Sequence, residues 1–340
     1  MEYRNLGRSG LQVSQLCLGA MMFGGPADAA TSRRLIARAF EAGFNFLDTA
    51  DAYNGGRSEE LVGEAIAPRR DAWVLATKLA NPMGPGPNER GLSRKWIMQA
   101  AEASLRRLRT ECVDILYLHK EDHGTPLEVT VRAMGDLVRA GKIRHFGVSN
   151  YRSWRIAEIC HLCDRMGLDR PVVSQPLYNA LNRQAEVEQI PAAAALGLGV
   201  VPYSPLARGV LTAKYLPGAE PPAESRVARR DKRVLETELR AESLEIAQRI
   251  RAHAEAVGTS PAHFAIAWVL NNRLVTGAVV GPRTEAQLED YIAALSYRFT
   301  AADEALVDGL VAPGHPSTPG YNDPQYPIEG RVAATTDPAA

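Results

Sequence analysis

The sequence predicts an α/β fold: a (β/α)8 TIM barrel with an N-terminal β-hairpin and a long insertion after the seventh strand. Strand and helix patterns alternate along the chain. The predicted ends of strands two to seven fall near residues 48, 78, 119, 149, 175 and 203, and their spacing matches one strand–helix unit. An open doubly wound sheet is the alternative. It would carry G-x-G-x-x-G after its first strand, and LGAMMFGG at 18–25 does not match that motif.

The elements follow in order from their residue patterns. A hairpin comes first, with strands at 2–6 and 11–19 joined by the turn GRSG. The eight barrel strands are short apolar runs, predicted at 16–19, 44–48, 72–78, 113–119, 143–149, 172–175, 198–204 and 276–281. Helical periodicity is found at 31–43, 92–108, 125–141, 235–258 and 261–272.

Local signals refine some of these elements. In the helix at 125–141, Thr125 is the predicted N-cap, Pro126 the first helical residue, Glu128 the capping-box partner and Gly141 the C-cap. After residue 203 the regular spacing ends. The polar stretch 219–233 is expected to be a long loop, the helix at 235–258 an insertion, and the tail from Pro313 irregular.

Composition is that of an ordinary globular protein. The 340 residues include 39 Lys and Arg against 39 Asp and Glu, so there is no basic surplus to favour nucleic acid or an anionic membrane as partner. The longest apolar run, 192–201, is half a membrane span. We expect one barrel domain over 1–330 and a flexible tail at 331–340. Four cysteines and no signal-like N-terminus favour a cytoplasmic location.

Polar or otherwise distinctive residues stand where almost every strand ends. They are Asp48, Lys78, His119, Ser149 with Asn150, Gln175, Tyr203 with Ser204, and Gly281 with Arg283. In a barrel the carboxyl ends of the strands share one rim, where catalytic groups lie. Each residue alone has a structural explanation, for example Asp48 as the N-cap of the following turn and Lys78 as a surface lysine. Nearby Asp51 is expected to be a turn or cap residue. Their convergence on one rim indicates a site.

Four side chains near this rim have compatible chemistry. Asp48 and Lys78 would neutralise each other, and the lysine charge would lower the pKa of the Tyr53 phenol from about 10. A phenol tuned in this way donates a proton near neutral pH. A neutral His119 would hold a carbonyl oxygen by hydrogen bonding. These groups suit protonation of a carbonyl as a hydride arrives.

At these residues the chain resembles the aldo-keto reductases, over nearly its whole length. The block GFNFLDTADAYNGGRSEELVG at 43–63 is similar to the family's first signature, with Asp48 and Tyr53 at its five-residue offset. ATK at 76–78 and DILYLH at 114–119 match the positions of the family's lysine and histidine. GKIRHFGVSNY at 141–151, QPLYN at 175–179 and YSPLARGVL at 203–211 match stretches that hold the cofactor.

The resemblance implies a reductase of aldehydes or ketones that uses NADPH, transfers hydride directly and runs in reverse as an alcohol dehydrogenase. Tyr53 would be the proton donor, Asp48 and Lys78 its tuning pair, and His119 the orienting group. Ser149, Asn150 and Gln175 would bind the nicotinamide carboxamide, and Tyr203 would stack on the ring. The other expected cofactor contacts are Ser204, Leu206 and Gly209 at the pyrophosphate, Gln287 and Asp290 at the adenosine, and also Gly19, Asp48 and Gly281.

Arg283 lies where the family meets the adenosine 2′-phosphate, which favours NADPH over NADH because a guanidinium suits a dianionic phosphate. Tyr291 departs from the family, many of whose members have asparagine there. It would stack on the adenine or pack under the helix. The expected partner is a small-molecule carbonyl compound in a pocket walled by Met22 and Phe23. The sequence does not identify this substrate or the oligomeric state.

Two other motifs have ordinary explanations. Cys160 and Cys163 form a C-x-x-C in a helical pattern with no second pair, so no metal site is expected. A basic cluster in the long loop is interpreted as a solvated charge group, with phosphate contact on loop closure as the alternative. It consists of Arg229, Arg230, Lys232 and Arg233.

Two further functions are consistent with the sequence. The family's fold also serves as the cofactor-bearing β subunit of potassium channels, so a regulatory module with little turnover is the alternative to an enzyme. A Schiff-base role for Lys78, as in aldolase-like barrels, is a third hypothesis. The cofactor motifs count against it.

Overall fold

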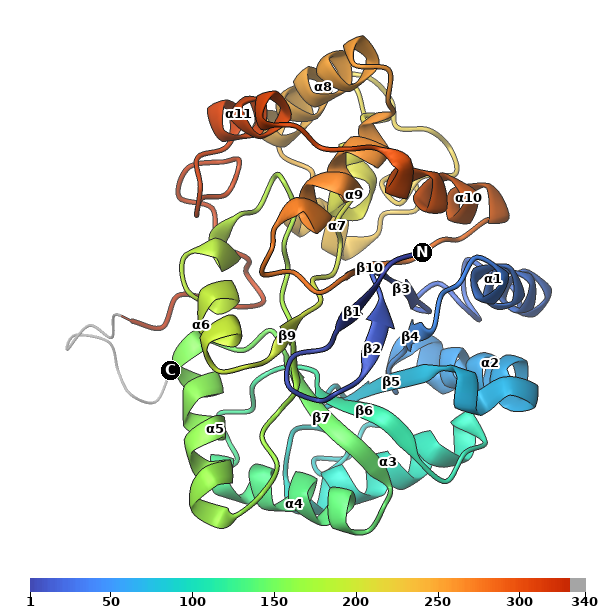
Figure 1. Cartoon of the computed structure of the whole chain (residues 1–340), viewed down its shortest axis with the longest axis vertical. Helices are drawn as coiled ribbons and strands as arrows, with labels where there is room; N and C mark the ends of the chain where they lie inside the picture. Colours follow the sequence, from blue (N-terminus) through green and yellow to red (C-terminus); the bar gives the residue numbers. More distant parts are fainter. Residues whose placement is uncertain (331–340) are drawn as a thin grey trace.

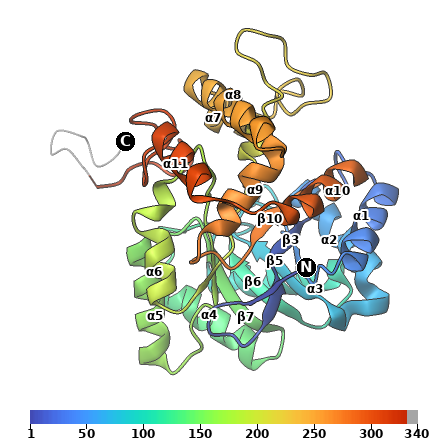
Figure 2. The same cartoon turned by 45° about the horizontal axis from the view of Figure 1, so that its top comes forward.

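A computed structural model of the chain describes residues 1–330 (Figures 1 and 2). Eight parallel strands form one sheet in the order β10-β3-β4-β5-β6-β7-β8-β9. These strands are β3 (Leu16–Gly19), β4 (Phe46–Asp48), β5 (Val74–Leu79), β6 (Val113–Leu118), β7 (Ile143–Ser149), β8 (Val173–Gln175), β9 (Gly199–Val200) and β10 (Ala278–Val280). All eight coincide with predicted strands, so that the polar residues after them come to one rim.

The sheet closes into a barrel between β9 and β10. Val279 N donates to Pro202 O at 2.9 Å and Thr276 N to Val200 O at 2.8 Å, and Tyr203 forms a parallel bridge with Val279. Strand β9 is shorter than predicted, since Pro202 has no N–H to continue a ladder. The predicted (β/α)8 barrel is therefore confirmed.

Helices alternate with the strands and form the outer layer seen in Figure 1. They are α1 (Ala29–Glu41), α2 (Arg57–Ile66), α3 (Arg94–Leu108), α4 (Leu127–Arg139), α5 (Ser153–Met166), α6 (Gln189–Ala195), α7 (Lys232–Thr237), α8 (Ala241–Ala256), α9 (Pro261–Asn271), α10 (Glu285–Ala293) and α11 (Ala301–Leu310). Short 3₁₀ turns are η1 (Tyr53–Gly56), η2 (Ala67–Ala72), η3 (Gln184–Glu186), η4 (Ala207–Thr212) and η5 (Ala294–Ser296). The helical patterns of the sequence do not include α2, α6 or α11.

Helix α4 begins later than predicted. Its N-cap is Pro126, and no side chain caps it. Thr125 Oγ1 instead donates to Asp122 Oδ2 at 2.8 Å. The capping-box prediction was wrong because the Asp122 carboxylate engages the hydroxyl within the preceding loop. Gly141, with φ of +68°, follows the C-cap residue Ala140.

The insertion after β9 contains two helices where one was predicted for 235–258. The break falls at Arg240, whose backbone is extended. The Arg240 guanidinium donates to Thr318 Oγ1 at 2.8 Å and to Ser317 Oγ at 2.9 Å. Its centre lies 3.8 Å from the centroid of the Tyr321 ring. These contacts with the C-terminal segment override the local helical pattern, and Figure 2 shows the loop before α7 projecting beyond α7 and α8.

The N-terminal hairpin, β1 (Tyr3–Asn5) and β2 (Gln12–Ser14), closes one end of the barrel (Figure 1). Leu6 and Val13 are fully buried and join the apolar side chains of the barrel interior. Gly7 has φ of +53°, and a Cβ there would lie 2.6 Å from the carbonyl oxygens of Val172 and Gly197. Only glycine fits this close approach, so the hairpin turn is locked against the loops that precede β8 and β9.

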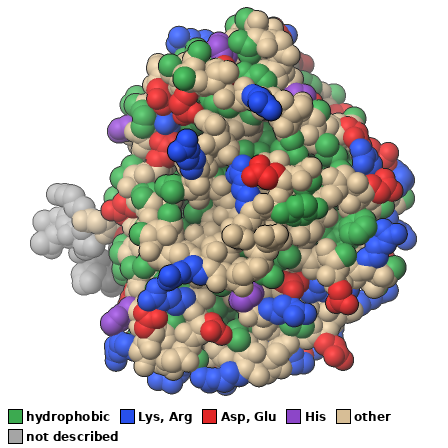
Figure 3. Space-filling view, in the orientation of Figure 1, with side chains coloured by type: hydrophobic (Ala, Val, Ile, Leu, Met, Phe, Trp, Pro, Cys, Tyr) green, Lys and Arg blue, Asp and Glu red, His purple; other side chains and the backbone are tan. Residues whose placement is uncertain are grey.

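The surface carries mixed charge. On the face drawn in Figure 3, basic and acidic side chains are interspersed and do not gather by sign. Within residues 1–330, no helix has both the length and the apolar character needed to cross a membrane. From Pro313 to Gly330 the chain forms no helix or named strand, as predicted. The tail predicted for 331–340 lies outside the described residues.

Candidate functional site

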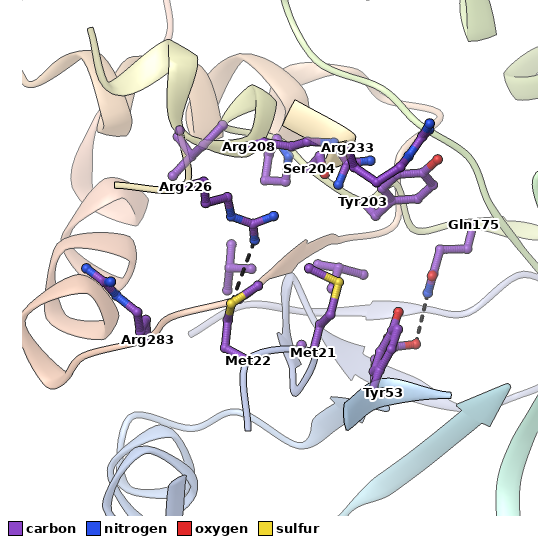
Figure 4. A pocket seen from close by; sticks show the side chains of 18 of the residues that line it. Met21, Met22, Tyr53, Gln175, Tyr203, Ser204, Arg208, Arg226, Arg233 and Arg283 are labelled. Atoms are coloured by element: carbon purple, nitrogen blue, oxygen red, sulfur yellow. Dashed lines mark hydrogen bonds between the residues drawn. The ribbon is translucent and has the colours of Figure 1, made fainter. Parts of the chain in front are cut away.

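A cavity opens at the carboxyl rim of the barrel, lined by residues at the ends of all eight strands and by the insertion. Figure 4 shows Met21, Met22 and Tyr53 on one side and Ser204, Arg208, Arg233 and Tyr203 on the other. Every sequence-predicted site residue except Lys78 and Phe23 lines this cavity. Lys78 lies directly beneath it, in contact with Asp48 and Tyr53.

Lys78 and Asp48 form a buried ion pair on neighbouring strands β5 and β4. Lys78 Nζ also donates to Thr49 O at 2.9 Å and to the Tyr53 hydroxyl at 3.3 Å. Gln175 Nε2 donates to the other Asp48 oxygen at 3.0 Å. Asp48 therefore binds an ammonium and an amide and does not cap the following turn. Burial lowers the pKa of Lys78, but the charge of Asp48 and the hydrogen bonds to Asp48 and Tyr53 outweigh it, so the pKa is raised and the amine stays charged.

The turn η1 presents Tyr53 to the cavity. Asn54 adopts a left-handed backbone with φ of +49°, and its Nδ2 donates to Met21 O at 3.0 Å and Phe23 O at 2.7 Å. Burial raises the pKa of the Tyr53 phenol, and the charge of Lys78 opposes this without reversing it. The predicted lowering of this pKa was wrong, because sequence shows the nearby charge but not the depth of burial. The phenol is consequently protonated at neutral pH.

His119 faces Tyr53 edge-on, with 5.9 Å between ring centroids and 80° between ring planes. Burial, and then the charges of Lys78 and Lys120, hold the pKa of His119 well below its usual value. The imidazole is therefore neutral, as predicted. Its Nδ1 lies 3.0 Å from Asn81 Nδ2.

A hydrogen-bonded group joins the ends of β7, β8 and β9. Ser149 Oγ donates to Gln175 O at 2.9 Å, and Asn150 Nδ2 donates to His119 O and to Ser149 Oγ, each at 3.0 Å. The Tyr203 hydroxyl donates to Asn150 Oδ1 at 2.8 Å. These bonds fix the direction of each amide and leave the Tyr203 ring as a flat wall of the cavity.

Positive charge gathers at the outer end of the cavity. Arg283 Nη1 donates to Glu224 O at 2.8 Å, and Gln287 Oε1 accepts from Arg283 N at 2.8 Å. Arg226, Arg229 and Arg283 are near enough to Lys214 to lower its pKa, after the larger effect of burial. A cluster of cations with spare donors suits anionic phosphates.

Other predicted outer residues have mixed roles. Asp290 lines the cavity, but its carboxylate is also hydrogen-bonded to the ring of His263, with 2.7 Å between Oδ1 and Nε2. Tyr291 also lines it while being mostly buried, and burial raises its pKa to about 12. Tyr291 therefore both packs under its helix and presents part of its ring to the cavity.

Sequence reasoning missed several residues of the cavity. Most of their side chains come from loops and from the insertion, where no motif marks them: Met21, Asn81, Lys120, Lys214, Arg226, Gln325 and Tyr326. Arg208 lies within the 203–211 motif but was not singled out. The basic cluster of the insertion divides. Arg229 and Arg233 line the cavity, whereas Lys232 is 83% exposed. Charge alone could not show which cations face inward.

Phe23 is not a wall of the cavity, so that prediction was wrong. Its side chain is fully buried in the main apolar core. The chain reverses after Ala20, and it is Met21 and Met22 that reach the cavity. Arg226 Nη2 lies 3.9 Å from Met22 Sδ, a contact between the insertion and the loop after β3 (Figure 4).

Asp51 and the cysteine pair lie outside the cavity lining. Both carboxylate oxygens of Asp51 are buried without a hydrogen-bond partner in residues 1–330. Burial, and then the charge of Glu59, raise its pKa to about 7. Asp51 stands in a turn, as expected, but its carboxylate forms no capping hydrogen bond within residues 1–330. Cys160 and Cys163 are buried on α5. Among the described residues they belong to no group of three ligands suited to a metal.

Known proteins resemble this chain over most of its length. A family model described as "Aldo/keto reductase family" matches residues 15–312. The chain is 40% identical to a probable voltage-gated potassium channel subunit beta of Oryza sativa subsp. japonica, over 87% of this chain and 91% of that protein. It is 38% identical to an uncharacterized oxidoreductase of Bacillus subtilis, with the same coverage. It is 34% identical to the L-glyceraldehyde 3-phosphate reductase of Escherichia coli O157:H7, over 92% and 93%. The chain belongs to the aldo/keto reductase family.

Proposed function

We propose that the protein is an NADPH-dependent oxidoreductase that reduces a small aldehyde or ketone to the alcohol. The observation that carries the proposal is the contact between a protonated phenol and a buried, charged lysine at a rim lined by cations. The Tyr53 hydroxyl lies 3.3 Å from Lys78 Nζ. An enzyme that protonates a carbonyl oxygen needs such a donor, together with a charge that stabilises the phenolate left behind.

The residues present fit a reduced nicotinamide nucleotide. Bound there, such a cofactor supplies a hydride to the carbonyl carbon. Tyr203 offers a flat ring, and the fixed amides of Asn150 and Gln175 offer polar partners for a carboxamide. The outer arginines and Lys214 suit the phosphates. Arg283 would hold the 2′-phosphate, which is the basis for proposing NADPH over NADH.

The protein's own groups would perform the proton transfer. Tyr53 gives its hydroxyl proton to the carbonyl oxygen, and the phenolate that forms is stabilised by Lys78. Asp48 keeps the lysine charged and in place. His119, being neutral, holds the carbonyl oxygen with a ring N–H. In the reverse direction the Tyr53 phenolate accepts the proton of an alcohol.

The decisive test is Tyr53→Phe. We expect kcat to fall by about 100-fold or more, the contribution of a general acid, while the Kd for NADPH, measured by fluorescence quenching, stays within about threefold of wild type, because the ring remains and only the hydroxyl is lost. Turnover within a few-fold of wild type would show that Tyr53 is not the acid.

A regulatory cofactor-binding module is the second candidate, favoured by the similarity to two probable potassium channel β subunits, 40% and 38% identical. Screening an aldehyde and ketone panel for NADPH oxidation separates the two functions. A module would bind NADPH tightly, co-purify with a partner and oxidise the cofactor only at a trace rate. A Schiff-base role for Lys78 is disfavoured, since the amine is charged and ion-paired.

A further inference from the structure

We propose that Asn81 is a positioning residue that keeps the proton of the His119 ring on Nε2, so that this nitrogen donates a hydrogen bond to the carbonyl oxygen of the substrate. The inference rests on the proposed carbonyl reduction and adds a residue outside the sequence motifs, which end at Lys78 on this strand. Asn81 acts only through His119.

The contact between the two side chains determines the tautomer. Asn81 Nδ2 lies 3.0 Å from His119 Nδ1, and both residues line the cavity. An amide nitrogen is a donor only, and a neutral imidazole carries a single N–H. A donor facing Nδ1 therefore makes Nδ1 the acceptor and leaves the proton on Nε2. Within residues 1–330, Nδ1 is the His119 ring atom that has a hydrogen-bond partner, so Nε2 is left free for a ligand in the cavity.

The strained backbone of Ala80 indicates that the surrounding fold fixes the direction in which the chain presents Asn81. Ala80 has φ of +135°, a conformation that a residue with a Cβ rarely adopts. Its side chain is almost fully buried, and its carbonyl oxygen accepts a hydrogen bond from Gly91 N at 2.8 Å. Strain of this kind persists where the surroundings hold it, and it is concentrated at functional sites. Here it turns the chain at the end of β5 so that Asn81 meets the end of β6.

The groups around His119 keep its ring neutral, so only one of its two nitrogens carries a proton. Lys78 faces it from β5, Lys120 lies on its own loop, and the Tyr53 ring packs against it from η1. Burial and the two lysine charges keep the ring neutral. An imidazolium would donate from both nitrogens, whereas a neutral ring donates from one, so the identity of that nitrogen decides whether the carbonyl meets a donor.

Asn81→Asp is the informative change, because a carboxylate accepts where the amide donated. The proton should move to Nδ1, and Nε2 should lose its donor at neutral pH. We expect kcat at pH 8 to fall by about 100-fold, the loss of one donor to the developing oxyanion. The kcat of this variant should then rise as the pH falls and His119 becomes doubly protonated. Wild type should show no such rise. Asn81→Leu, which can neither donate nor accept, should lie between the two.

Nitrogen NMR of the ¹⁵N-histidine-labelled protein reads the tautomer without turnover, with His119→Gln to identify the signals. Wild type should show a protonated Nε2 and an unprotonated Nδ1, and Asn81→Asp the reverse. Asn88→Asp is the matched control: it places the same charge on an exposed residue of the same loop and should leave both readouts at wild type. The inference is overturned if Asn81→Asp keeps the wild-type ring signals, or if its pH profile parallels that of wild type. Absence of turnover in wild type would instead count against the proposed function, and the NMR result would still decide the role of Asn81.

Discussion

Replacing Asp51 with asparagine should change how stability depends on pH. The Asp51 carboxyl is buried without a partner in residues 1–330, and its pKa rises from 3.8 to about 7 on folding. Between these values the unfolded chain releases the proton and the folded protein keeps it. The contribution of Asp51 to the free energy of unfolding of wild type therefore falls as pH rises from about 4 to 7 and is level above that. Asparagine does not titrate, so the variant lacks this pH-dependent contribution between pH 4 and pH 7.

The magnitude follows from the interval between the two pKa values. Each pH unit contributes about 1.4 kcal/mol, so the full effect is about 4 kcal/mol, of which about 3 kcal/mol falls between pH 5 and pH 8. The asparagine of the variant brings a constant offset from its own buried amide, and this offset cancels when the two pH values are compared. We therefore expect Asp51→Asn to gain about 3 kcal/mol on wild type when the pH is raised from 5 to 8.

Urea unfolding of both proteins at pH 5 and pH 8 measures this difference. Asp71→Asn is the matched control, because Asp71 is exposed and its replacement should shift stability equally at both pH values. If the difference between Asp51→Asn and wild type were the same at pH 5 and pH 8, the assignment of a protonated, buried Asp51 would be refuted.

Three other substitutions test the cofactor site, the buried ion pair and the position of Phe23 outside the cavity. Arg283→Leu should raise the Kd for NADPH by about tenfold or more, the loss of a charge-assisted contact, and leave the Kd for NADH unchanged; equal effects on both nucleotides would contradict its role at the 2′-phosphate. Lys78→Met should destabilise the protein by about 3–5 kcal/mol in urea unfolding, since it strands the buried Asp48 charge, and adding Asp48→Asn should recover part of that loss. Phe23→Ala should cost about 3–5 kcal/mol as a core cavity while KM for a carbonyl substrate stays near wild type, and a large rise in KM with unchanged stability would restore Phe23 to the pocket wall.

The strands and the rim residues were predictable because their signals are local. Most of the strands are apolar runs that end in or are followed by a polar residue, and parallel strands bring those residues to one level. The sequence alone therefore groups Asp48, Lys78, His119 and Gln175. The prediction for Phe23 was wrong because this residue lies in a loop, where no periodicity tells an inward side chain from an outward one.

Helix ends and the insertion were predicted less well, for a different reason. Thr125 carries a capping signal, but its hydroxyl is bound by Asp122. The pattern at 235–258 is helical throughout, yet Arg240 breaks it to reach Ser317 and Thr318. In the first case a contact within the loop, and in the second a contact with a distant segment, outweighs a local preference worth about 1 kcal/mol.

The order of residues along this chain by itself determines the barrel, the rim and the kinds of side chain that meet there, because hydrophobic periodicity and strand-end position are properties of neighbouring residues. The protonation of those groups was decided only in three dimensions. Burial raises the pKa of Tyr53 against the pull of Lys78 and keeps His119 neutral, and Asn81, three residues past the lysine, comes to face the histidine ring. Solvent exclusion and cross-strand contact depend on the whole packed barrel, and no stretch of sequence records them.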